Sequence, residues 1–180
     1  DGGKARACCS HNAAKFDEGL AKDAKAWHVG KDPVATGLKT VVEHIESKGP
    51  YDGAYAFSQG ACVVTLLSDP LVWKAMGGSD AHFPPWKWVI IGCGSDYLLD
   101  GSRYELPERP PTAEAPLALP SFHIIGRKDG IIDDSLSLSR RYKDSVVVYH
   151  EEGHAIPIGL AAEDCDQRKQ LKAFLRERGL

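Results

Sequence analysis

The sequence runs Tyr51-Asp-Gly-Ala-Tyr-Ala-Phe-Ser-Gln-Gly60 and continues at once into the apolar segment Ala61-Cys-Val-Val-Thr-Leu-Leu67. An alternating, aromatic-rich segment stops at Ser58, turns through Gly60 and becomes a helix without an intervening loop. Such a sharp strand-to-helix turn, called a nucleophile elbow, presents a serine hydroxyl above a sheet. It favours small residues two positions before and after the serine; Gly60 fits, and Ala56 stands where glycine is usual. The stretch predicts a nucleophilic Ser58, with an ordinary strand–turn–helix corner as the alternative.

An acid and a histidine follow this serine in the chain, each after a further predicted strand. Ser121-Phe-His-Ile-Ile-Gly126 is a short β-rich run, and Asp129 comes shortly after it. Ser145-Val-Val-Val-Tyr149 is another such run, and His154 follows it in a loop with little bulk. Serine, then aspartate, then histidine, each after a strand end, is the chain order of α/β-hydrolase triads. The sequence therefore predicts a serine-hydrolase site made of Ser58, Asp129 and His154.

The candidate residues have distinct expected roles. His154 would act as the base, because a neutral imidazole with a reference pKa of about 6.5 is suited to take the proton of a serine near pH 7. The alternative is that His154 only caps the last helix. Asp129 would orient the imidazole and stabilise its cation. Its competitors are Asp133 and Asp134, which we interpret as a turn residue and the N-cap of the next helix. The backbone N–H of Gln59, at a helix start, is expected to supply one oxyanion-hole contact.

Strands and helices alternate along the chain, which predicts an α/β fold with a parallel sheet flanked by helices. The expected strands are Gly53–Phe57, Trp86–Ile91, Phe122–Ile125 and Val146–Tyr149. The expected helices begin at Pro33 and stop before Gly49, and then cover Gln59–Ser68, Leu71–Met76, Asp134–Tyr142 and Ile158–Arg178. The segment Pro107–Pro120 is rich in proline and is expected to be an irregular surface loop.

Composition limits the possible classes of protein. The 180 residues are enough for one domain, and 43% hydrophobic with 26% charged residues is ordinary for a globular protein. A net charge of -3 leaves no basic footprint for nucleic acid. The apolar stretches are too short to span a membrane, and the N-terminus lacks the apolar core of a signal peptide.

The five cysteines show no C-x-x-C spacing, so we expect reduced thiols in a cytoplasmic protein rather than a disulfide scaffold. Cys62 and Cys93 lie in apolar runs and are interpreted as small core residues. Cys8, Cys9 and His11 could hold a metal in principle, but no second group of ligands accompanies them. We therefore expect neither a metal nor another cofactor.

Four motifs stand out together: Gly49-Pro-Tyr-Asp-Gly53 with Phe57-Ser-Gln-Gly60, Pro84-Pro-Trp-Lys-Trp-Val-Ile-Ile91, Pro120-Ser-Phe-His-Ile-Ile-Gly-Arg-Lys-Asp129 and Gly153-His-Ala-Ile-Pro157. Through these motifs the sequence from Trp27 to the C-terminus resembles the serine hydrolase FSH family, a branch of the α/β hydrolases. The family uses the serine of F-S-Q-G as nucleophile, the aspartate of H-x-x-G-x-x-D as acid and the histidine of G-H-x-x-P as base. The resemblance implies these roles for Ser58, Asp129 and His154.

Two departures from the family pattern matter. The first is Ala56, which replaces the family's glycine. The second is the absence of the opening strand and H-G loop, which in the family supply an oxyanion-hole donor. We therefore expect residues 1–26 to be poorly organised and residues 27–180 to form the hydrolase domain without its N-terminal strands. The strand Gly53–Phe57 would then be an edge, which invites association with another chain.

The resemblance implies a serine hydrolase that cleaves carboxylic esters through an acyl-enzyme intermediate. The expected partner is a small acyl-ester or thioester substrate, and the oligomeric state stays open. An acyl-thioesterase is one alternative, because the same groups attack oxygen and thiol esters. A catalytically impaired, hydrolase-like binding module is the other.

Overall fold

The computed structural model describes residues 33–96, 116–162 and 164–179. Within them, four parallel strands form one sheet in the order β1-β2-β3-β4. Their bounds are Ala54–Phe57 for β1, Val89–Gly92 for β2, Ser121–Gly126 for β3 and Ser145–His150 for β4. The predicted α/β class with a parallel sheet is confirmed, and each expected strand is present, although β2 begins at Val89 rather than at Trp86.

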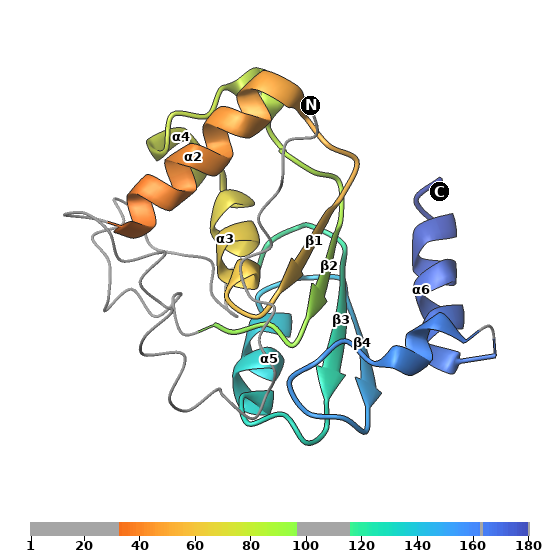
Figure 1. Ribbon diagram of the computed structural model, residues 1–180. Helices are drawn as coiled ribbons and strands as arrows, with labels where there is room; N and C mark the ends of the chain where they lie inside the picture. Colours follow the sequence, from red (N-terminus) through yellow and green to blue (C-terminus); the bar gives the residue numbers. More distant parts are fainter. Residues whose placement is uncertain (1–32, 97–115, 163, 180) are drawn as a thin grey trace, which may run out of the picture.

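Helices lie on both faces of the sheet (Figure 1). One face carries α2 (Pro33–Lys48), α3 (Gly60–Leu67), α4 (Pro70–Ala75) and α5 (Ile132–Ser139), and the opposite face carries α6 (Asp166–Arg176). Two short 3₁₀ helices complete the described elements, η3 (Asp80–His82) and η4 (Ile158–Ala161). Because the four strands are parallel, their carboxyl ends all lie at the same edge of the sheet.

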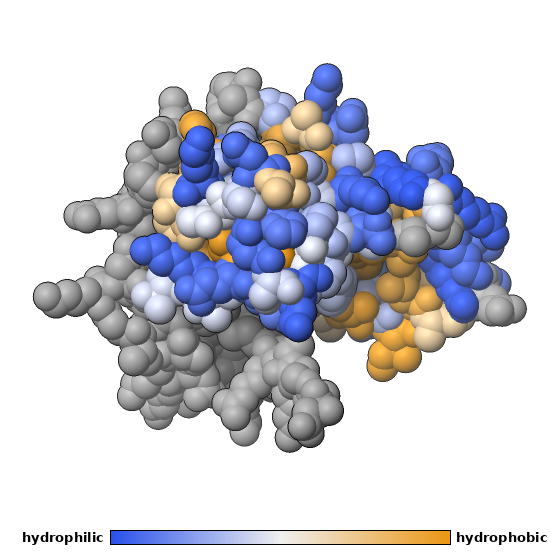
Figure 2. Space-filling model, turned by 90° about the horizontal axis from the view of Figure 1, so that it is seen from above, coloured by the Kyte–Doolittle hydropathy of each residue, from blue (hydrophilic) through white to orange (hydrophobic). Residues whose placement is uncertain are grey.

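A hydrophobic core fills each side of the sheet. The larger one joins β1 and β2 to α2, α3 and α4, with Leu38, Trp73 and Ile91 almost fully buried. The smaller one holds Phe122, Ile124 and Val148 of the strands against Phe174 of α6. All six residues of β3 are buried, as expected for a central parallel strand. Among the residues coloured by hydropathy in the view from above, hydrophilic ones predominate, and hydrophobic ones gather at the lower right (Figure 2).

The expected closing helix Ile158–Arg178 is wrong. The chain forms η4 first and then α6, which begins only at Asp166. Between them, Ala162 and Cys165 have extended backbone with ψ of 138° and 125°, so helical hydrogen bonds cannot continue through this segment. Each helix packs separately against the smaller core, through Leu160 and Phe174.

The expected helix Asp134–Tyr142 is displaced toward the N-terminus. Its N-cap is Ile131 and not Asp134, which lies in the first turn of α5, where an acidic charge suits the helix dipole. The helix also ends earlier, because Tyr142 forms a parallel β-bridge with Leu117.

The prediction of an irregular surface loop over Pro107–Pro120 is wrong for residues 116–120, the part of it that the structure describes. Leu117 and Leu119 are buried in the larger core, and Leu117 exchanges backbone hydrogen bonds with Arg141 and Lys143. Residues 107–115 lie outside the described residues, and so do the predicted poorly organised segment 1–26 and the cluster Cys8, Cys9 and His11. Among the described helices, none is both long and apolar enough to cross a membrane.

Candidate active site

Ser58 lies in the turn between β1 and α3, and its backbone φ of 53° is in the left-handed region. Its N–H donates to the Gly92 carbonyl at 3.0 Å, and its own carbonyl accepts the N–H groups of Ala61 and Ser95, each at 3.1 Å. A left-handed conformation is costly for a residue with a Cβ and persists only where the surroundings hold it. These three hydrogen bonds supply that support, and the turn has the form of the predicted elbow.

The alanine that replaces the usual glycine is accommodated without strain. Ala56 is buried in the larger core, on the strand that leads into the turn. A Cβ built on Gly60 would lie 3.9 Å from the Ala56 Cβ, which is an ordinary van der Waals contact. Helix α3 therefore leaves enough room over β1 for the alanine methyl group.

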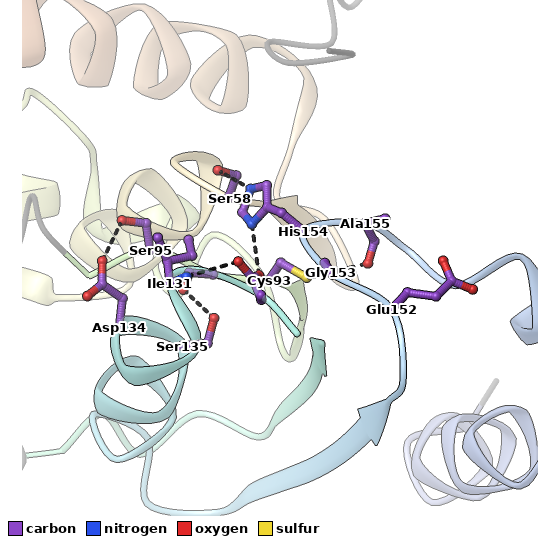
Figure 3. A network of polar contacts seen from close by, with 12 residues as sticks. Ser58, Cys93, Ser95, Ile131, Asp134, Ser135, Glu152, Gly153, His154 and Ala155 are labelled. Atoms are coloured by element: carbon purple, nitrogen blue, oxygen red, sulfur yellow. Dashed lines mark hydrogen bonds and ion pairs between the residues drawn. The ribbon is translucent and has the colours of Figure 1, made fainter. Parts of the chain in front are cut away.

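The three predicted site residues lie together at the carboxyl edge of the sheet. His154, in the loop after β4, places Nε2 3.0 Å from Ser58 Oγ. Its Nδ1 lies 2.8 Å from Oδ2 of Asp129, which follows β3. The side chains of His154 and Asp129 are only 10% and 1% exposed. Figure 3 shows the imidazole directed toward Ser58 on one side. A neutral ring that donates from Nδ1 to the carboxylate leaves Nε2 free to accept the serine proton.

Local hydrogen bonds hold the Asp129 carboxylate in place. Its Oδ1 accepts the N–H of Ile131 at 3.0 Å, while its own N–H donates to the Gly126 carbonyl at 3.2 Å. The competing acid Asp134 instead accepts a hydrogen bond from the Ser95 hydroxyl at 3.4 Å. Burial, followed by the charge of Asp96, raises the pKa of Asp134 above its usual value.

Two glycines, Gly92 and Gly126, allow the His154 loop to approach the sheet, a role that the sequence patterns did not predict. A Cβ on Gly126 would collide with the carbonyl oxygens of Gly153 and Glu152, the latter at 2.7 Å. A Cβ on Gly92 would collide with the side chain of Ile156. Each glycine is the last residue of a buried strand that leads into a loop of the site. A glycine at the end of a predicted buried strand is therefore the sequence signal that indicates such a close approach.

The side chain of Cys93, which its apolar sequence context identifies only as a core residue, also reaches the site. It follows β2 with φ of 45°, is fully buried, and its thiol donates to the Ala155 carbonyl at 3.4 Å. The metal-ligating atoms of Cys93, Asp129 and His154 all lie within 4.8 Å of one another. Among the described residues, no other group of three such side chains is so close. Burial, with a smaller contribution from Asp129, raises the pKa of the thiol from 9.0 to about 12.

Gln59, the predicted oxyanion-hole residue, occupies the N-cap position of α3. No acceptor for its backbone N–H occurs in the part of the chain that the structure describes. The positive end of the helix dipole lies at this position and favours negative charge. Within the described residues, this N–H group is left to donate to a group beside Ser58.

The fold places the chain in the α/β-hydrolase class. A solved α/β-hydrolase enzyme from the metagenome of sediments from the Mar Chica lagoon in Morocco superimposes with a TM-score of 0.52 at 17% identity. The match covers 82% of this chain and 71% of that one. The sequence model of the serine hydrolase (FSH1) family matches residues 9–164. The chain belongs to this family.

Several curated relatives are named as esterases. Esterase OVCA2 of Bos taurus is 36% identical over 123 residues, which are 67% of this chain and 49% of that protein. Esterase CG5412 of Drosophila melanogaster is 34% identical over 122 residues, which are 67% of this chain and 39% of that protein. The chain thus spans about half the length, or less, of these relatives.

Proposed function

We propose that this protein hydrolyses carboxylic esters with Ser58 as nucleophile, His154 as general base and Asp129 as the acid that orients it. The observation that carries the proposal is the continuous contact through one imidazole, 3.0 Å to the serine oxygen and 2.8 Å to the carboxylate. Membership of a serine hydrolase family supports the same reading.

The first half of the reaction transfers the acyl group to the enzyme. Ser58 Oγ attacks the carbonyl carbon while His154 Nε2 takes the hydroxyl proton, and the carbonyl oxygen becomes a negatively charged oxyanion. The Gln59 N–H stabilises that charge. Collapse of the tetrahedral intermediate breaks the bond to the alcohol, which leaves with the proton from His154.

The second half restores the enzyme. A water molecule loses a proton to His154 and attacks the acyl carbon, and the Ser58 oxygen leaves and regains that proton. Asp129 carries no proton in either half; it holds the Nδ1 proton of His154 by a hydrogen bond and stabilises the imidazolium that forms twice. The products are a carboxylic acid and an alcohol.

Labelling with a fluorophosphonate probe tests the nucleophile. The wild-type chain should form one adduct, and Ser58→Ala should abolish it while circular dichroism stays unchanged. Ser95→Ala is the matched control, because Ser95 is equally buried but its hydroxyl faces Asp134. Labelling that survives Ser58→Ala refutes the proposal.

A panel of oxygen esters and thioesters of increasing acyl length separates the substrate classes. Faster turnover of oxygen esters supports the esterase assignment, and faster turnover of thioesters at matched acyl length supports the acyl-thioesterase. A chain that neither labels nor turns over any ester is the binding module, and that result refutes the proposed activity.

A further inference from the structure

The Cys93 thiol brings a third metal-ligating group to the contact between Asp129 and His154. The three donor atoms belong to residues that follow three different strands, β2, β3 and β4, and lie within 4.8 Å of one another. Cys93 and Asp129 are buried, and His154 is the most exposed of the three. In Figure 3, the thiol lies beside the imidazole on the side away from Ser58. The three side chains thus face a common point next to the proposed triad.

Thiolate, imidazole and carboxylate are the ligands that Zn²⁺ prefers in proteins. A Zn²⁺ ion with three protein ligands keeps a fourth, open position for water, and needs donor atoms about 2.0–2.3 Å from the metal. Donor atoms less than 4.8 Å apart can reach such an ion after small side-chain movements. Mg²⁺ and Ca²⁺ prefer sites made of oxygen ligands only, so this set of ligands favours a thiophilic ion.

We propose that Cys93, Asp129 and His154 form an inhibitory Zn²⁺ site that competes with the catalytic arrangement. The inhibition rests on the function proposed above, whereas the binding of the ion does not. No resident metal is implied: the ion binds to and switches off the same side chains that otherwise act on the substrate.

The inhibition follows from the proton count on His154. In the active arrangement the single imidazole proton is on Nδ1, hydrogen-bonded to Asp129. Zn²⁺ bound at Nδ1 takes that position, so a neutral ring must carry its proton on Nε2. The nitrogen that faces Ser58 is then a donor and cannot accept the serine proton. The Asp129 carboxylate is at the same time turned from the imidazole to the metal.

The thiol proton leaves the protein when the ion binds, because only the thiolate is a zinc ligand. The imidazole proton is retained on the other nitrogen. Each Zn²⁺ ion bound should therefore release one proton to the solvent.

Direct binding is measured with Co²⁺, which reports thiolate coordination by its near-ultraviolet absorption. The experiment uses the full chain with Cys8→Ser and Cys9→Ser, which removes the cysteine pair at the N-terminus. The band should appear on this background, persist in Ser58→Ala and disappear in Cys93→Ala. Cys62→Ala is the matched control, because Cys62 is buried as well but donates to the Ser95 carbonyl at 2.8 Å.

Inhibition is measured as the ratio of fluorophosphonate labelling with and without Zn²⁺, so that differences in basal labelling between variants cancel. Zn²⁺ should lower this ratio in the background protein, and EDTA should restore it. Cys93→Ala should raise the half-inhibiting concentration at least about 10–100-fold, the range for loss of even an indirect metal partner. Cys93→Ser provides a second variant of nearly native shape.

Two results would overturn the inference: a cobalt–thiolate band that is absent from the background protein or unchanged in Cys93→Ala, and equal Zn²⁺ sensitivity of Cys93→Ala and Cys62→Ala. The cobalt band and the proton release do not depend on turnover. A protein that binds Co²⁺ through Cys93 but never reacts with the probe therefore refutes the proposed hydrolase activity and keeps the metal site.

Discussion

His154 Nε2 lies 3.0 Å from Ser58 Oγ although 96 positions separate the two residues in the sequence. The two side chains meet because β1 and β4 are parallel members of one sheet, so the loops after them emerge at the same edge. The hydrogen bond to Asp129 from the opposite side of the ring fixes which nitrogen faces the serine.

Asp129→Asn should lower kcat by about 10⁴, because an amide at this position favours the wrong imidazole tautomer. Asp133→Asn is the control: Asp133 is an exposed residue in the first turn of α5, and its loss should change kcat by less than about threefold and stability by at most ~1 kcal/mol. Steady-state kinetics on an ester substrate measures both. A larger loss in Asp133→Asn would show that the acid is misassigned.

Gly126→Ala should lower turnover by about 10²-fold without unfolding the protein. The added methyl group would collide with the backbone of Gly153, next to His154, and a shift of about 1 Å in a catalytic group has this effect. Gly130→Ala is matched, since Gly130 adjoins Asp129 but a Cβ there meets no atom within 4 Å. Similar activity in the two variants would mean that the loop adapts to the methyl group.

Stability should fall as the pH is lowered from about 6.5 toward 3. Burial lowers the pKa of His123 from 6.5 to about 3, and it also lowers the pKa of His150. At these two histidines the unfolded chain binds more protons than the folded one within this range, so their contribution to the free energy of unfolding decreases with falling pH. For His123 alone the loss reaches on the order of 3 kcal/mol at about pH 4.5.

Urea unfolding at several pH values measures this slope. His123→Gln should reduce the slope of the free energy of unfolding against pH by about one proton. The variant can also be less stable at pH 7, because His123 packs against Tyr142 and contacts the Ser121 hydroxyl at 3.0 Å. That loss does not change the expected difference in slope. An unchanged slope in His123→Gln would assign the acid sensitivity to other groups.

Phe174→Ala should destabilise the protein by about 3–5 kcal/mol, the usual range for loss of a large aromatic side chain from a core. Phe174 is the buried anchor of α6 and packs against Phe122 and Trp88, with ring centroids 5.4 and 6.5 Å away. Lys172→Ala, on the exposed side of the same helix, should change stability by less than about 0.5 kcal/mol. Chemical unfolding of both variants is the measurement. Equal effects would show that α6 contributes little to the smaller core.

Local patterns in the sequence predicted most of the framework. The four strands, the helix from Pro33 and the turn at Ser58 were identified because hydrophobic periodicity and glycine or proline breaks act over a few neighbouring residues. The positions of Asp129 and His154 after their strands followed from the same patterns and from the family resemblance. The prediction of one continuous closing helix was wrong because the backbone of Ala162 and Cys165 is extended, although their residue types permit a helix.

The sequence by itself determined where each strand and its turn lie, and therefore which residues follow each strand. Strands and turns depend on interactions between near neighbours. Only the tertiary structure decided that Cys93 stands beside Asp129 and His154, and that Gly126 lies under the His154 loop. Those contacts depend on the register of parallel strands and on the close approach of loops that are distant in sequence. Neither the register nor the approach of the loops produces a periodic pattern in the sequence. A cysteine or glycine after a strand looks the same in the sequence whether or not a distant loop packs against it.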